Sequence, residues 1–268
     1  MDYLYDGTFE GFLTCVYLHY YEEKATGIYA APAEFGGAAF IGAQPETGYQ
    51  QRLGVPFRLT ETDAEKAAKV YEAIPKKVSD FCLRRCYQIF LTSVPDKDNI
   101  NLQYLRLAFK LGPGVDSLHS HPVVYAAQRA AGKVSWEVDK LSGLLRFSVL
   151  GEQPGILYGP VTPDHDIIAL LGEHFADRYK EEAFIIHDLR RGKALFYRPD
   201  TKSWAIAPLQ KKDLPAYSAE EQQWQRLWKH YFDSIAIKER INPRCQRNFM
   251  PVRYWANLTE FSGNPLDR

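Results

Sequence analysis

The sequence predicts an α+β fold in which an antiparallel sheet packs against helices. Helical periodicity with Pro and Gly punctuation dominates residues 1–143, whereas apolar residues recur with a period of two from Leu144 onward. A last helix carries an apolar stripe, and a basic tail follows it. We therefore expect a mostly helical lobe at 1–143 and a sheet lobe at 144–268, which together form one compact unit.

The first lobe should begin with a short strand over Asp2–Tyr5, followed by a helix over Phe9–Tyr21 with Thr8 as its N-cap. Residues 25–54 are rich in Gly, Ala and Pro, which favours an irregular loop. Pro56–Thr60 is a candidate strand. Four further helices are expected, at Asp63–Ile74, Ser79–Thr92, Asn99–Leu111 and Pro122–Ala131.

The second lobe has the order strand, strand, helix and three-strand meander, which predicts an antiparallel sheet with a helix on one face. The helix should start at Thr162-Pro163-Asp164, because Thr caps, Pro suits the first position and Asp suits the positive end. Ser218 opens the C-terminal helix. Its apolar stripe is predicted to be buried in the core and consists of Trp224, Leu227, Trp228, Tyr231 and Ile235.

The net charge is zero but unevenly distributed, since residues 178–268 hold 17 Lys and Arg against 11 Asp and Glu. This excess of six positive charges agrees equally with a polyanionic partner and with a solvated surface. The first residues lack a basic leader region, and no apolar run approaches the ~20 residues of a membrane span. We expect a cytoplasmic protein that does not associate with membranes.

Neither the histidines nor the cysteines have the spacing of a closed metal site. His165 and His174 are nine residues apart, so one helix would place them on opposite sides. The four cysteines would all have to converge to hold an iron–sulfur cluster. We therefore expect no zinc, no iron–sulfur cluster and no other cofactor.

The tail from Lys238 to Trp255 carries five basic residues against one acid, with aromatic residues interleaved. Cations that contact phosphates beside rings that stack on bases are typical of nucleic-acid binding. Alternatively, Tyr254 and Trp255 pack the tail onto the core while the arginines remain solvated. Arg244, Arg247 and Arg253 are the leading candidates for phosphate contacts.

Five stretches spanning nearly the whole chain resemble a bacterial family that contains a domain of unknown function and is assigned to DNA metabolism or DNA repair. They are YDGTFEGFLTCVYLHY at 5–20, VSWEVDKLSGLLRF at 134–147, PDHDIIALLGEHFADRY at 163–179, FIIHDLRRGKALFY at 184–197 and MPVRYWANLTEF at 250–261. The resemblance implies a gene encoded beside a radical-SAM protein, and a related domain is fused to uracil-DNA-glycosylase-like domains. Relatives often carry His where this chain has Asp139.

The resemblance implies a DNA-binding or accessory component that works with a radical-SAM partner on DNA, without an established reaction. The nucleic-acid-binding candidates are Arg146, Arg190, Arg191, Arg244, Arg247, Arg253, Tyr254 and Trp255. An alternative is a hydrolase or lyase acting on a modified base or nucleotide, with catalytic candidates Asp6, Glu137, Asp164 and His165. A third alternative is a protein-binding scaffold that does not contact nucleic acid.

The turn at Asp6-Gly7-Thr8 is also predicted to form the edge of a site. Asp and Thr flank a glycine at the start of a helix, where backbone N–H groups commonly bind anions. The prediction requires that this turn is not covered by core side chains.

Overall fold

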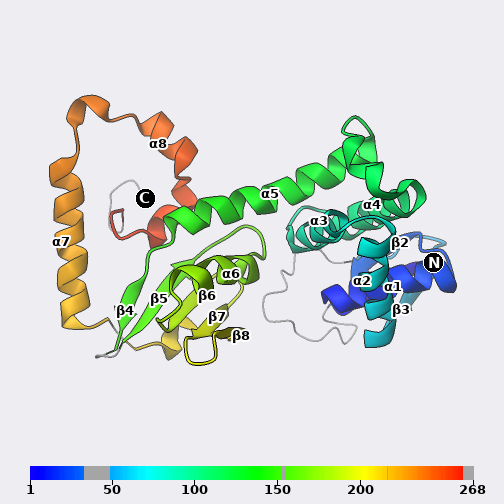
Figure 1. The fold of residues 1–268 in the computed structure, drawn as a ribbon, viewed down its shortest axis with the longest axis horizontal. Helices are drawn as coiled ribbons and strands as arrows, with labels where there is room; N and C mark the ends of the chain where they lie inside the picture. The colour runs from blue at the N-terminus through cyan, green and yellow to red at the C-terminus, as the bar shows by residue number, and fades with distance from the viewer. Residues whose placement is uncertain (33–48, 152–154, 216, 262–268) are drawn as a thin grey trace. The chain divides into compact units, whose positions relative to one another are not determined.

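The computed structural model describes residues 1–32, 49–151, 155–215 and 217–261. The chain divides into two compact units, Met1–Ser135 and Trp136–Arg268, which we call the N-terminal and C-terminal units. Helix α5 (Pro122–Leu144) contributes to both. Helices and strands are mixed in each unit (Figure 1). Within the described ranges, no helix combines the length and apolar character needed to cross a membrane.

The N-terminal unit contains a three-stranded parallel sheet in the order β2-β1-β3, where β1 is Asp2–Tyr5, β2 is Gly27–Ala30 and β3 is Phe57–Leu59. The irregular loop predicted for residues 25–54 is therefore wrong at Gly27–Ala30, and residues 33–48 lie outside the described ranges. Helix α1 (Phe9–Tyr21) joins β1 to β2, and such a crossover brings the second strand back parallel to the first.

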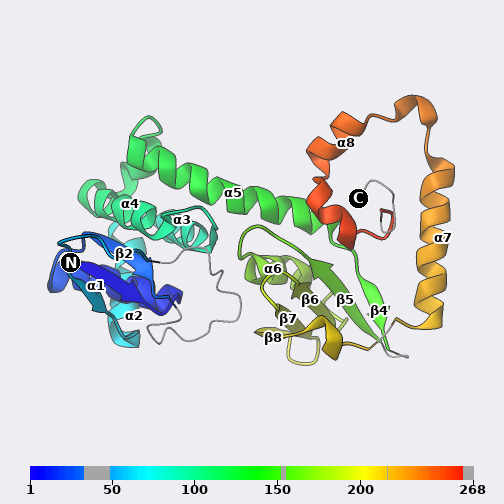
Figure 2. The same cartoon turned by 180° about the vertical axis from the view of Figure 1, so that it is seen from behind.

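Helix α1 has its predicted bounds, and the Thr8 side chain accepts the Gly11 N–H at 2.9 Å, which confirms the N-cap. Its buried face joins one apolar core with the other helices of this unit. Those helices are α2 (Ala64–Lys77), α3 (Asp80–Leu91), α4 (Lys97–Leu111) and the first half of α5. Figure 2 shows α1 near α2.

Three of the four cysteines are buried in this core, whereas Cys245 is exposed. Burial raises the pKa of the Cys15 thiol to about 12 and that of Cys82 to about 11, so neither forms a thiolate near neutral pH.

We expect a disulfide reagent to label one thiol per native chain rapidly and four after denaturation, measured by absorbance. Cys245→Ser should remove the rapid phase, and labelling of a second native thiol in that phase would contradict the buried core.

The C-terminal unit contains a five-stranded sheet in the order β4-β5-β6-β7-β8. The strands are β4 (Ser148–Leu150), β5 (Ile156–Val161), β6 (Phe184–Asp188), β7 (Lys193–Arg198) and β8 (Ser203–Pro208). Strands β6, β7 and β8 pair antiparallel, but β5 and β6 are parallel. The predicted wholly antiparallel sheet is therefore wrong, because α6 (Ile168–Arg178) carries the chain back across the sheet before β6 begins.

Helix α6 packs closely against the sheet and starts later than predicted. A Cβ on Gly172 would lie 2.2 Å from Leu195 Cδ1 on β7, so the missing side chain permits this approach. The predicted start at Thr162-Pro163-Asp164 is wrong, since the helix begins at Ile168. His165 therefore lies in the segment before the helix and not in its first turn.

Helix α7 (Ala219–Ile235) begins at Ser218, whose side chain accepts the Glu221 N–H at 3.1 Å as predicted. The predicted burial of its apolar stripe is wrong, because all five of its side chains are exposed. Phe232, on another side of the helix, contacts Phe261 instead. Figure 1 shows α7 at the edge of its unit, set apart from the sheet. Periodicity identifies an apolar face, but it does not show whether the same chain covers it.

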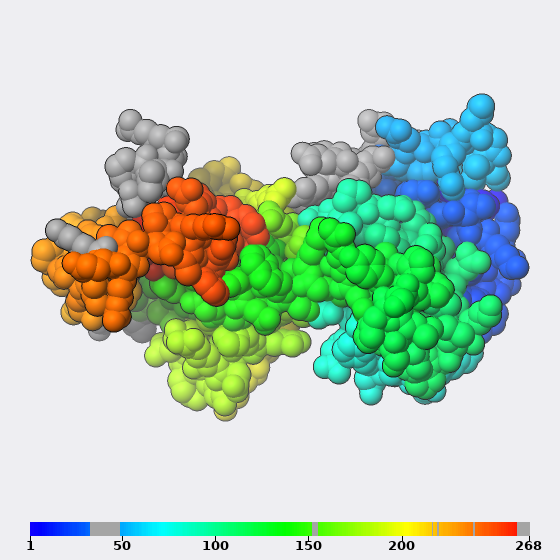
Figure 3. Space-filling view, turned by 90° about the horizontal axis from the view of Figure 1, so that it is seen from above, coloured from blue at the N-terminus to red at the C-terminus, as the bar shows by residue number. Residues whose placement is uncertain are grey.

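The chain after α7 folds back onto the second half of α5. Helix α8 (Pro243–Phe249) is followed by a 3-10 turn at Val252–Asn257. Figures 1 and 2 show α8 beside α5, and the space-filling view shows this orange and red segment against the green helix (Figure 3). A small core of Trp255, Leu258 and Phe261, with Leu144, Phe232 and Met250, anchors the return.

Candidate nucleic-acid interface

The buried carboxylate of Glu137 on α5 joins two segments that are distant in the sequence. It accepts the backbone N–H groups of Asp164 at 2.9 Å and His165 at 2.8 Å. It also accepts the Tyr254 hydroxyl at 2.6 Å. Glu137 is 1% exposed, so these bonds replace the water that a buried carboxylate loses. The carboxylate thus connects α5, the Pro163–His165 turn and the C-terminal tail.

The same turn is held from its other side by Arg191. Its guanidinium donates to the carbonyl of Pro163 at 3.1 Å and to that of Asp164 at 2.7 Å. It also pairs with the buried carboxylate of Asp188 at 2.9 Å. Glu137 thus satisfies the N–H groups of the turn and Arg191 its carbonyls. These tertiary bonds replace the helical turn that the sequence predicts at this point.

Burial and charge act in opposite directions on Asp188. Desolvation raises the pKa of its carboxyl group, while the Arg191 guanidinium and the Arg191 backbone N–H lower it, and burial has the larger effect. For Tyr254, burial first and the bond to Glu137 second raise the pKa of the hydroxyl. Tyr254 therefore stays protonated and keeps donating to Glu137 at any pH near neutral.

The turn presents the Asp164 side chain to solvent between two arginines. One carboxylate oxygen lies 3.1 Å from Arg190 Nη1 and the other lies 3.2 Å from Arg253 Nε. All three side chains are about 40% exposed. Arg253 also donates to the Tyr254 hydroxyl at 2.9 Å, which links the surface pair to the buried Glu137. Two cations thus accompany one carboxylate at this surface.

Aromatic rings extend this charged surface along α5 and α8. Trp136 is 43% exposed and Phe249 is 67% exposed. Lys140 Nζ lies 5.4 Å from the Trp136 ring centroid and 5.2 Å from that of Phe249, while the Arg253 guanidinium carbon lies 5.9 Å from the Trp136 ring. These are cation–π distances. We call the set Trp136, Lys140, Phe249, Arg190 and Arg253 the Trp136 surface.

Three of the four predicted catalytic residues, Glu137, Asp164 and His165, come together in the C-terminal unit, and His165 is buried. The contacts of Glu137 and Asp164 stabilise the fold around the turn. The Glu137 carboxylate receives three hydrogen bonds, and Asp164 pairs with two arginines. Among the described residues no group of three or more His, Cys, Asp or Glu side chains could hold a metal ion.

Asp6, the fourth predicted catalytic residue, belongs to the N-terminal unit. Its carboxylate accepts the backbone N–H and hydroxyl of Thr8 at 3.0 and 2.6 Å, and the hydroxyl of Thr62 at 2.7 Å. A Cβ on Gly7 would have no atom within 4 Å, so core side chains do not cover the turn at that point. The Asp6 carboxylate itself is nevertheless the anion at this helix start, and a second one would be repelled.

The predicted nucleic-acid-binding residues occupy different environments. Arg190 and Arg253 lie on the Trp136 surface, and Arg244 and Arg247 are exposed on α8. Arg191 is buried, and Arg146 pairs with Glu260 at 2.9 Å in a groove beside α7. Tyr254 and Trp255 are buried, which fits the alternative that they pack the tail in place.

Sequence patterns do not identify three members of the Trp136 surface. Trp136 and Lys140 follow Ala131, where the helix is predicted to end, although α5 continues to Leu144. Their spacing of four residues would indicate a shared helix face once that length is known. Phe249 is one aromatic residue among several in the tail, and its exposure depends on the tertiary fold.

A family model described as a domain of unknown function, DUF4130, matches residues 95–260, more than half of the chain. The match covers the whole Trp136 surface together with Glu137, Arg191 and α7. No curated protein and no solved structure gives a significant match.

Proposed function

The chain belongs to the DUF4130 family, and we propose that it is a cytoplasmic DNA-binding component of DNA metabolism or repair that works with a radical-SAM protein. The observation that carries the proposal is the Trp136 surface, where exposed rings and cations lie together. The sequence resemblance supports DNA as the polymer and a radical-SAM protein as the partner.

In this proposal the cations contact phosphates and the exposed rings stack on bases. Lys140, Arg190 and Arg253 supply charge at the Trp136 surface, and Arg244 and Arg247 extend it along α8. Trp136 and Phe249 offer faces on which an unpaired base stacks, whereas the bases of an intact duplex are already stacked on each other. The bonds from Glu137 and Arg191 hold the underlying turn in one geometry, so the backbone of the turn loses little conformational entropy on binding.

The same geometry supports a binding role over an acid–base catalyst. A general base needs a carboxylate that can accept a proton from substrate. The Glu137 carboxylate is buried and already receives hydrogen bonds from the turn and Tyr254, and that of Asp164 is paired with Arg190 and Arg253.

Binding should depend on salt through the exposed arginines. We expect the full chain to bind labelled single-stranded and duplex oligonucleotides, with log K falling linearly against log salt concentration. Replacing Arg244, Arg247 and Arg253 together by Ala should flatten the duplex slope by roughly two to three units, since each lost phosphate contact removes roughly 0.9. Fluorescence anisotropy at four or more salt concentrations measures both quantities.

A second variant separates stacking from charge. Trp136→Leu with Phe249→Leu should weaken single-strand binding by about 10-fold or more and leave the salt slope unchanged, because neither ring carries charge. Replacing Lys180, Lys211 and Lys212, three exposed cations of the same unit, by Ala is the matched charge control and should change the slope little. Wild-type protein that binds neither oligonucleotide at low salt would exclude the DNA-binding role.

A further inference from the structure

The Asp164 carboxylate bridges two arginines that come from separate segments of the C-terminal unit. Arg190 follows β6, whereas Arg253 lies in the tail beyond α8. One carboxylate oxygen lies 3.1 Å from Arg190 Nη1 and the other lies 3.2 Å from Arg253 Nε. The two guanidinium groups thus converge on one small anionic group. Such a pair also suits a phosphate, whose oxygens accept the same charge-assisted hydrogen bonds.

The backbone and the side chain of Asp164 are held very differently. Its backbone N–H donates to the buried Glu137 carboxylate, and its carbonyl accepts from Arg191. Its side chain is 40% exposed and meets Arg190 and Arg253 at the surface. Rotation about the side-chain bonds alone can therefore carry the carboxylate into solvent while the turn stays in place.

The ion pairs around Asp164 leave no net charge with which to attract a phosphate. Arg190, Asp164, Arg253 and Glu137 follow one another through contacts of 3.1, 3.2 and 3.7 Å. This series contains two cations and two carboxylates, so its formal charge is zero. A carboxylate that has rotated into solvent is screened by water and salt. A phosphate therefore gains the attraction of both arginines once the Asp164 carboxylate has left them.

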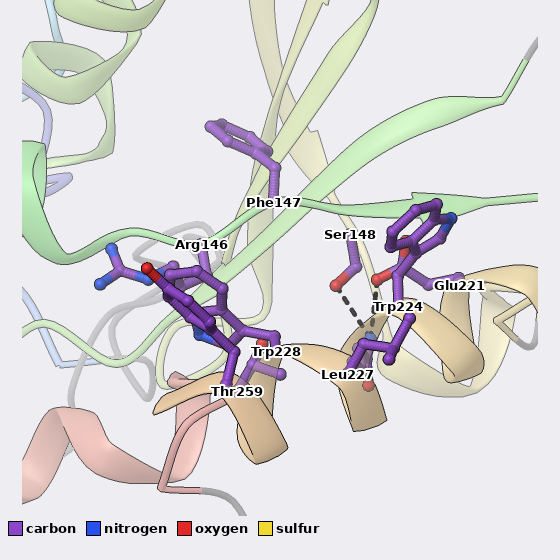
Figure 4. A pocket seen from close by; sticks show the side chains of 10 residues that line it. Arg146, Phe147, Ser148, Glu221, Trp224, Leu227, Trp228 and Thr259 are labelled. Atoms are coloured by element: carbon purple, nitrogen blue, oxygen red, sulfur yellow. Dashed lines mark hydrogen bonds between the residues drawn. The ribbon is translucent and has the colours of Figure 1, made fainter. Parts of the chain in front are cut away.

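The pair of Arg146 and Glu260 differs from this arrangement because its carboxylate is buried. The Glu260 side chain is 2% exposed, and its other oxygen accepts the Trp228 indole N–H at 3.3 Å. Figure 4 shows Arg146 and Trp228 in the groove beside α7. Breaking this pair would leave a buried charge without its partner, which is costly. The exposed pairs of Asp164 contribute much less to stability, so a ligand can replace them.

The position of the two arginines also agrees with the phosphate of a nucleotide. The Arg253 guanidinium carbon lies 5.9 Å from the centroid of the exposed Trp136 ring. Single-stranded nucleic acid binds where rings stack on bases and neighbouring cations contact the backbone. A base stacked on Trp136 would therefore have its backbone close to the guanidinium group.

We propose that Arg190 and Arg253 form a phosphate subsite of the Trp136 surface, which the Asp164 carboxylate occupies until a nucleic-acid phosphate displaces it. The proposal rests on the DNA-binding role proposed above, and it adds the position of one phosphate and the residue that competes with it. Asp164 is then a determinant of affinity, because every phosphate that binds here must first break its two ion pairs.

Removing the charge of Asp164 should strengthen binding. We expect Asp164→Asn to bind a labelled single-stranded oligonucleotide about 10-fold more tightly than the wild type at low salt, because two exposed ion pairs no longer compete. The gain should shrink as salt rises, since salt screens such pairs. Asp177→Asn is the matched control. It removes the same charge from an exposed carboxylate that pairs with Lys180, and it should change the affinity by less than about 2-fold.

A background that lacks both arginines tests whether Asp164 acts through them. In the Arg190→Met/Arg253→Met chain, Asp164→Asn should raise the oligonucleotide affinity no more than Asp177→Asn does. A gain that persists at full size would mean that the Asp164 charge repels DNA from a distance, which contradicts the subsite. Urea unfolding of each variant, followed by tryptophan fluorescence, verifies that it is folded under the binding conditions.

Inorganic pyrophosphate tests the subsite without DNA. Asp164→Asn should bind it about 10-fold more tightly than the wild type in isothermal titration calorimetry, and adding Arg253→Met should remove the gain. An Asp164→Asn chain that binds pyrophosphate no more tightly than the wild type would overturn the proposal, whatever the wild type does with DNA. If this gain is found but the wild type binds no oligonucleotide at low salt, the DNA-binding role is excluded and the phosphate subsite stands.

Discussion

Replacing Glu137 by Ala should lower the free energy of unfolding of the C-terminal unit by about 3–5 kcal/mol. The change leaves the backbone N–H groups of Asp164 and His165, and the Tyr254 hydroxyl, without the buried carboxylate that accepts them. Removing the acceptor shared by three donors has this cost, because each buried donor that is left unsatisfied costs about 1–3 kcal/mol. The Pro163–His165 turn and the tail should loosen together.

Tryptophan fluorescence during urea unfolding measures this loss of stability in the C-terminal unit. All five tryptophans lie between Trp136 and Trp255, within the C-terminal unit. At a typical slope of about 2 kcal/mol per molar urea, the midpoint should fall by about 2 M.

Two other substitutions give stability changes with which the loss from Glu137→Ala can be compared. Asp139→Ala removes an exposed carboxylate from the same helix and should change stability by about 0.5 kcal/mol or less. Tyr254→Phe removes one of the three hydrogen bonds and should cost about 1.5–3 kcal/mol. If Glu137→Ala unfolds at the same urea concentration as Asp139→Ala, the carboxylate does not hold the turn and the tail.

Local signals in the sequence predict those elements whose boundaries depend on neighbouring residues. Thr8 caps α1 and Ser218 caps α7, because each hydroxyl accepts an N–H three residues ahead. The start of α6 is different. Thr162-Pro163-Asp164 has good helix-start chemistry, but Glu137 and Arg191 bind the backbone of this segment from elsewhere in the chain. Such contacts override local preference and are invisible in a window of residues.

In the candidate site, too, the sequence predicts some features, and tertiary contacts decide the others. The resemblance directs attention to Glu137, Asp164, His165 and Arg253, and the structure places all four within one network. The resemblance does not indicate that Glu137 is buried and holds the turn while Arg253 lies at the surface, because burial depends on the tertiary packing. The sequence predicts burial of the stripe on α7 for a related reason, because the periodicity of an apolar face is the same whether or not its own chain covers it.

Arg190 and Arg191 are adjacent and chemically identical, yet their replacement by Met should have very different effects. Arg190→Met should cost no more than about 1 kcal/mol, because its pair with Asp164 is 3.1 Å long but substantially exposed to solvent. Arg191→Met should cost about 3–5 kcal/mol, because it leaves the buried Asp188 carboxylate without its opposite charge and the carbonyls of Pro163 and Asp164 without this side-chain donor.

The loss from Arg191→Met should also depend on pH. Burial already raises the pKa of Asp188 above its ordinary value of 3.8, and without the opposing Arg191 charge that pKa rises further. A carboxyl group whose pKa is higher in the folded state adds no penalty below its unfolded pKa, and its penalty grows as pH rises from the unfolded pKa to the folded pKa and is constant above it. The difference in stability between Arg191→Met and wild type should therefore be largest near pH 7–8 and shrink as pH falls toward 4.

Urea unfolding followed by tryptophan fluorescence at several pH values between 4 and 8 measures both effects. Arg190→Met is the matched control, since it removes the same side chain one residue away and its difference from wild type should change little over this range. Equal losses for the two variants at pH 7 would mean that Arg191 does not stabilise the Pro163–His165 turn and the Asp188 carboxylate. A loss for Arg191→Met that grows as pH falls would contradict the assignment of Asp188 as the group left unpaired, because protonation removes the buried charge and relieves its cost.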